Sequence, residues 1–156
     1  LTFRNRLTLF RGGREIQLLF FGRGHTGGDV VVYLPQEKVV CTGDLFSAGI
    51  NYMGDGYVDE WAATLEELKR LDFVTVIPGH GEVFTGKERI DYVQAYLRDL
   101  WTKTMELKGQ GVPAEEAAKR VDMTSHKARF PQIQAAGVDP GAVLRIYELT
   151  DERARR

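Results

Sequence analysis

The chain has 156 residues, a formal net charge of −1 at pH 7 and a single cysteine, Cys41. This length suits one domain spanning residues 1–156. The near-neutral charge argues against a nucleic-acid partner, and one thiol excludes an intrachain disulfide. No apolar run approaches the roughly 18 residues that a membrane-spanning helix needs, so we expect no membrane partner.

The sequence does not assign a cellular compartment. Its first residues, Leu1–Arg4, are neither a signal peptide nor a usual translation start. A native start near Leu1 implies a cytoplasmic protein, whereas a start further upstream leaves room for a targeting segment.

The first half of the chain predicts strands and the second half predicts mostly helices. Strands are expected where apolar residues alternate or run together between turn residues, at 7–9, 15–21, 30–34, 39–42 and 73–77. Gly12 and Gly13 predict a tight hairpin turn. Apolar residues at helical spacing predict helices near 59–71, 85–109, 113–121 and 141–149.

Two helix starts carry capping signals. Asp59 is expected to cap the first helix, and Thr85 with Glu88 forms the spacing of a capping box for the longest helix. Strand 15–21 is apolar on both sides, which is typical of a strand buried on both faces.

Three short segments place a possible metal ligand in a glycine-rich turn after an apolar strand. Residues 24–29 read Gly-His-Thr-Gly-Gly-Asp, residues 42–44 read Thr-Gly-Asp, and residues 78–81 read Pro-Gly-His-Gly. Imidazole nitrogen and carboxylate oxygen are ligands of catalytic zinc and related divalent ions. The candidates are therefore His25, Asp44 and His80.

Each candidate also has a plain structural interpretation. A single histidine in a turn is usually only a polar turn residue, and an aspartate after glycine is usually a cap. Asp29 is expected to tie down the loop at His25, and His126 is expected at the surface. Cys41 is expected to be a small buried hydrophobe. Packing or surface roles are likewise expected for Phe130, Arg145 and Tyr147.

The order of these motifs and strands resembles the metallo-β-lactamase superfamily. The resemblance extends over residues 1–110 and predicts the carboxyl-terminal half of that fold, with residues 111–156 as a helical extension. It implies an α/β (α+β) fold: half of a four-layer αββα sandwich, with a mixed sheet and helices on one face.

The resemblance also implies roles for the candidate residues. His25 matches a histidine of the first metal site, Asp44 matches the catalytic carboxylate that bridges two ions, and His80 matches a histidine of the second site. Thr26, Asp29 and Gly79 match supporting positions. The implied cofactor is one or two zinc ions, with iron or manganese as alternatives, and the implied reaction is hydroxide attack on an ester, thioester or lactam of a small-molecule substrate.

The chain departs from the superfamily in one respect. The first signature, His-x-His-x-Asp-His, is absent, because the only histidines are His25, His80 and His126. We therefore expect weak or no metal binding and no activity in the isolated chain. The absence of the other half predicts an exposed apolar sheet face, covered in a homodimer or by an amino-terminal half.

Two functions therefore stand side by side. The first is the carboxyl-terminal part of a metal-dependent hydrolase. The alternative is a non-catalytic scaffold or dimerisation module derived from the same fold.

Overall fold

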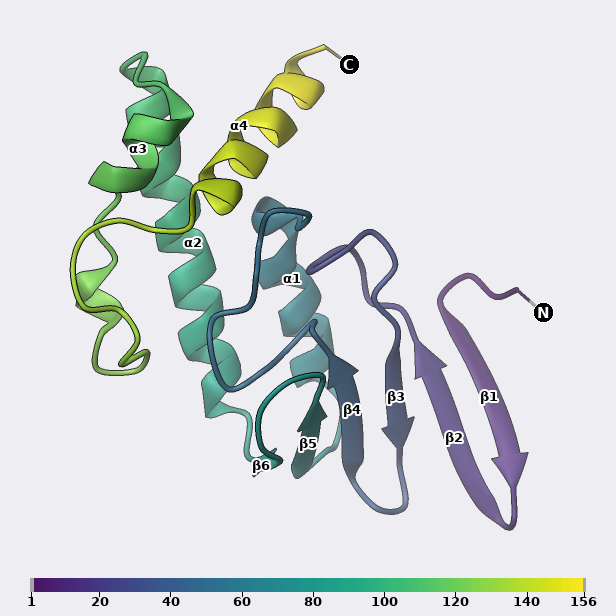
Figure 1. The fold of residues 1–156 in the computed structure, drawn as a ribbon. Coiled ribbons are helices and arrows are strands. Elements are labelled where there is room, and N and C mark those ends of the chain that lie inside the picture. Colours follow the sequence, from purple (N-terminus) through teal and green to yellow (C-terminus); the bar gives the residue numbers. More distant parts are fainter. Residues whose placement is uncertain (1, 156) are drawn as a thin grey trace.

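The computed structural model describes residues 2–155 as a six-stranded mixed sheet with helices packed on one face (Figure 1). The strand order follows the chain, and all neighbours are antiparallel except β4 and β5, which are parallel. The strands are β1 Arg6–Arg11, β2 Arg14–Leu19, β3 Val31–Leu34, β4 Val39–Gly43, β5 Thr75–Pro78 and β6 Phe84–Thr85. The predicted mixed α/β class is confirmed.

Four α-helices and one short 3₁₀ helix make up the remainder of the regular structure. They are α1 Val58–Lys69, α2 Glu88–Gly109, α3 Ala114–Arg120, the 3₁₀ helix Thr124–His126 and α4 Pro140–Ala154. All four predicted helices are present, with bounds shifted by a few residues. Between residues 2 and 155, no helix combines the length and the apolar character that crossing a membrane requires.

The β1–β2 hairpin turns where the sequence predicts it. Gly12 and Gly13 have φ angles of 58° and 78°, in the left-handed region that glycine enters without steric cost. Two successive positive φ angles are typical of the turn whose twist matches that of the flanking strands.

The helix-facing side of the sheet forms the core. Val40 of β4 and Val76 of β5 are paired neighbours, Val31 lies on the same side of β3, and all three are completely buried. Leu65 of α1 and Leu97 of α2 belong to the same cluster and are equally buried. Burial of these branched side chains is the main favourable contribution to folding, at about 1.5–3 kcal/mol each.

The opposite side of the sheet carries a continuous apolar surface, which we call the open face. The strand register places nine apolar side chains on it, and none is fully buried: Leu7, Leu9, Ile16, Leu18, Val32, Leu34, Val39, Cys41 and Ile77. Between residues 2 and 155, no helix or strand covers this face (Figure 1). The exposed apolar face predicted from the sequence is therefore present.

Both predicted caps are wrong. Asp59 lies inside the first turn of α1, after the N-cap residue Tyr57, and no side chain caps that end. Thr85 belongs to β6 and pairs with Thr75 of β5. Because its main chain forms part of the sheet, α2 starts later, at Glu88 after the N-cap residue Lys87.

Two single-residue expectations also need correction. His126 is not a surface residue: its side chain is 16% exposed, and Nε2 lies 2.9 Å from Oδ2 of Asp99 on α2. Lys103 contacts the same carboxylate, so the imidazole belongs to a group of three polar side chains beside α2. Cys41 is only partly buried, because it lies on the open face; burial still raises the pKa of its thiol.

A valine-to-alanine substitution should lower the stability more on the helix-facing side of β4 than on the open face. We expect Val40→Ala to lower the free energy of unfolding by about 2–3 kcal/mol, because it leaves a cavity under the helices. Val39→Ala, on the open face, should cost less than about 1 kcal/mol. Urea unfolding at low micromolar concentration measures both, and equal losses would show that the open face is covered in solution.

Candidate metal centre

The parallel pairing of β4 and β5 places two candidate ligands next to each other. The amide of Gly79 donates to the carbonyl of Gly43 across the strand ends at 2.9 Å. The residues that follow are Asp44 and His80, and Nε2 of His80 lies 3.4 Å from Oδ2 of Asp44. Two candidate ligands separated by 36 positions in the sequence thus meet at one edge of the sheet.

The Asp44 carboxylate is held between the two strand ends. Oδ1 is buried and has no hydrogen-bond partner among residues 2–155. Position 79 must be glycine for this arrangement, because a Cβ there would lie 2.4 Å from Oδ1. A buried carboxylate oxygen without a partner destabilises the fold, and a cation or a hydrogen-bond donor beside this atom would offset that cost.

The loop after Asp44 supports it from the main-chain side. The side-chain amide of Asn51 donates to the carbonyl of Asp44, and the hydroxyl of Ser47 donates to the side-chain oxygen of Asn51. Sequence reasoning missed both residues. Their only signal is that they are polar residues in the loop that follows the Thr-Gly-Asp turn.

His25 lies on a separate, tightly hydrogen-bonded loop. The Asp29 carboxylate accepts hydrogen bonds from the amide of Thr26 at 3.0 Å and from its hydroxyl at 2.6 Å. The His25 ring meets the edge of Trp61, with centroids 5.7 Å apart, and the indole N–H of Trp61 donates to the carbonyl of Leu45. Trp61 therefore links the His25 loop to the segment that carries Asp44.

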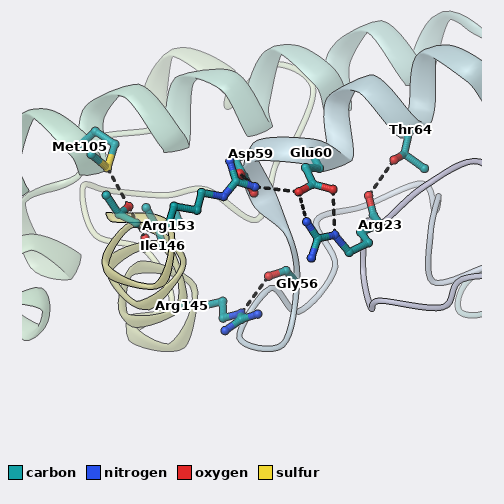
Figure 2. Close-up of polar contacts among 10 residues, drawn as sticks. Arg23, Gly56, Asp59, Glu60, Thr64, Met105, Arg145, Ile146 and Arg153 are labelled. Carbon is teal, nitrogen blue, oxygen red and sulfur yellow. Dashed lines mark hydrogen bonds and ion pairs between the residues drawn. The ribbon is translucent and has the colours of Figure 1, made fainter. Parts of the chain in front are cut away.

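An ionic network fixes the start of the His25 loop to α1 and α4 (Figure 2). The guanidinium of Arg23 forms two hydrogen bonds to Glu60, and Arg153 of α4 pairs with the same carboxylate. The hydroxyl of Thr64 donates to the carbonyl of Arg23 at 2.7 Å. The last helix is thus tied to the loop that carries His25.

Arg145 has a similar role on the same helix. Its Nε donates to the carbonyl of Gly56 at 3.1 Å, and its guanidinium lies over the ring of Tyr57, 5.1 Å from the centroid. Arg145 is therefore a packing residue that joins α4 to the segment before α1, as Figure 2 shows.

Comparison with known proteins identifies the family. The model of the metallo-beta-lactamase superfamily matches residues 1–80, which is half of the chain. The chain belongs to the metallo-β-lactamase superfamily. A metallo-beta-lactamase type 2 from Bacillus cereus is 37% identical over 78 residues, a match that covers 46% of this chain and 30% of that protein.

Solved structures of superfamily members agree with the fold. A metallo-beta-lactamase from Pontibacter korlensis has a TM-score of 0.55 at 28% identity, covering 62% of this chain and 47% of that one. A sec-alkylsulfatase from Pseudomonas has a TM-score of 0.72 at 18% identity, covering 95% of this chain and 26% of that one. The second likeness shows the fold alone. The division at residue 110 stays a prediction.

The chain spans less than half the length of the curated metallo-beta-lactamases it matches, from 30% to 43%. Superfamily members depend on metal in general, and the donor set here fits a metal only in part. Asp44 and His80 are adjacent and the buried oxygen of Asp44 is free to accept a cation. Yet residues 2–155 contain no group of three His, Cys, Asp or Glu side chains that could hold an ion.

The network around Glu60 predicts a pH dependence of stability. The hydrogen bond from Arg23 is the main cause that lowers the pKa of Glu60 below its ordinary value of 4.5. Because the pKa is lower in the folded state, the ionised carboxylate stabilises the fold at pH values above the ordinary pKa. This stabilisation is lost as the pH falls through the folded-state pKa. We expect Glu60→Gln to cost less than about 1 kcal/mol at pH 7, because the pair is partly exposed.

The measurement is urea unfolding from pH 7 down to pH 3. The variant should lose less stability than the wild type below pH 4.5. Glu115→Gln, an exposed glutamate on α3, serves as the matched control and should follow the wild-type profile. Parallel profiles for all three proteins would contradict the assignment.

Proposed function

We propose that this chain forms the carboxyl-terminal part of a metal-dependent hydrolase and contributes His25, Asp44 and His80 to its metal centre. The observation that carries the proposal is the Asp44 carboxylate, with one buried unpartnered oxygen and His80 beside the other. Zinc suits imidazole and carboxylate ligands, and iron or manganese are alternatives. The proposed substrate is a small molecule with an ester, thioester or lactam bond.

A bound zinc ion would lower the pKa of water and stabilise the negative charge that develops on the substrate carbonyl. The residues of this chain hold and orient that chemistry. Asp44 would supply a carboxylate ligand, Gly79 keeps the space beside it free, and Asn51 fixes its main chain. His80 is 82% exposed, so its ring is open to solvent and accessible to a substrate.

The centre is incomplete with the residues present. The chain has three histidines, and His126 is engaged with Asp99. We propose that the other ligands come from a segment outside residues 1–156, and that the isolated chain binds zinc weakly and is inactive.

The test compares the isolated chain with the complete product of its gene. We expect the complete product to bind zinc and to hydrolyse at least one member of an ester, thioester and lactam panel. Asp44→Asn should lower kcat/KM by at least about 100-fold and reduce the bound zinc, because it removes a ligand charge without changing shape. Metal content is measured by mass spectrometry after dialysis.

Asp55→Asn, in an exposed turn, is the matched control and should leave both quantities unchanged. A complete gene product that holds zinc and cleaves nothing on the panel would remove the hydrolase proposal. Unchanged zinc content in Asp44→Asn would remove the ligand role.

The open face favours a second candidate function, a non-catalytic dimerisation module. Nine apolar side chains on one uncovered sheet surface are typical of an interface, and a twofold pairing would bury the same face of both copies. We expect sedimentation equilibrium at micromolar concentration to show a dimer and Leu18→Lys to give a monomer. Leu144→Lys, exposed on α4, should leave the dimer intact. A well-folded wild-type monomer would contradict this candidate.

A further inference from the structure

A cavity of about 510 Å³ lies between the loop after β4 and the loop before α4. Its volume is in the range of roughly 300–1,000 Å³ that is typical of small-molecule sites. Its apolar lining residues include Ile50, Met53, Met123, Ile133, Ala136 and Ala142. None of these residues is among the candidate metal ligands.

One tyrosine of α2 lines this cavity. Tyr96 as a whole residue is 5% exposed, and the hydrogen bonds among residues 2–155 include none to its hydroxyl. Burial, and secondarily the charge of Asp139, raises the pKa of Tyr96 to about 12. The hydroxyl therefore stays protonated and can donate to an acceptor atom inside the cavity.

The only charged side chain in the wall is negative. The carboxylate of Asp139 caps α4 by accepting from the amide of Gly141 at 3.0 Å, which holds it in place. No lysine or arginine lines the cavity. An anionic ligand would meet repulsion here, whereas an uncharged one would not.

The cavity adjoins the candidate metal centre through one side chain. Asn51 forms part of the wall and donates to the carbonyl of Asp44. A molecule in the cavity would therefore contact Asn51, the residue that holds the main chain of Asp44.

We propose that this cavity binds the hydrocarbon part of an uncharged small molecule, with the Tyr96 hydroxyl donating a hydrogen bond to an acceptor atom on it. That the bound molecule is a substrate rests on the proposed hydrolase function. The binding itself depends only on residues of this chain.

The three methionines of the chain allow a direct test by methyl NMR. Met53 and Met123 line the cavity, whereas Met105 lies outside it, against Thr150 of α4. Titration with methyl hexanoate should shift the methyl signals of Met53 and Met123 and leave that of Met105 in place. Hexanoate at pH 7 should bind at least about 10-fold more weakly, because of Asp139.

Three variants separate the parts of the proposal. Tyr96→Phe should weaken methyl hexanoate binding by about 5-fold, as expected for one lost hydrogen bond. Asp139→Asn keeps a capping side chain and should reduce the difference in affinity between methyl hexanoate and hexanoate. Ala136→Phe should fill the cavity and abolish binding, and Ala63→Phe, exposed on α1, is its matched control.

The outcomes distinguish this proposal from the hydrolase proposal. Shifts in all three methionines, shifts in none, or equal affinity for ester and acid would overturn the cavity assignment. Selective shifts in a gene product that hydrolyses nothing would keep the cavity and remove the hydrolase function. Hydrolysis with an unchanged KM in Ala136→Phe would mean that the substrate does not use the cavity.

Discussion

One main-chain contact organises the candidate metal centre: the parallel alignment of β4 and β5, with the amide of Gly79 donating to the carbonyl of Gly43. It sets the register that brings His80 to Asp44. It also forces the Gly79 main chain against the carboxylate, which leaves no room for a side chain at that position. The chemistry available at this edge therefore depends on how two strands end rather than on any single ligand.

The sequence was sufficient to predict this edge, because strand ends carry strong local signals. Apolar runs followed by Gly-Asp and Pro-Gly-His indicate where β4 and β5 stop, and the Gly12–Gly13 pair indicates the hairpin. Such local signals do not fix where His25 lies relative to the other two candidate ligands. Its loop is positioned by Trp61 and by the Arg23–Glu60 pair, which are contacts made only in the folded chain.

The wrong predictions share a physical cause. Thr85 fits a capping box by spacing, but strand pairing with Thr75 takes priority over the cap. His126 has polar sequence neighbours, yet its ring contacts Asp99 on α2 and is partly buried there. A partner 27 residues away leaves no signal in the local sequence. Local propensity is a weak signal wherever a long-range partner competes for the same group.

The open face ends at a strand whose free side has a consequence for association between chains. β1 is an edge strand with one unpaired side; Leu9, on the open face, and Phe10, on the opposite face, are 41% and 77% exposed. Sheet edges of this kind recruit further strands from other molecules. Arg6 and Arg11 place charged side chains at the two ends of β1, a feature that disfavours pairing with a strand of another molecule.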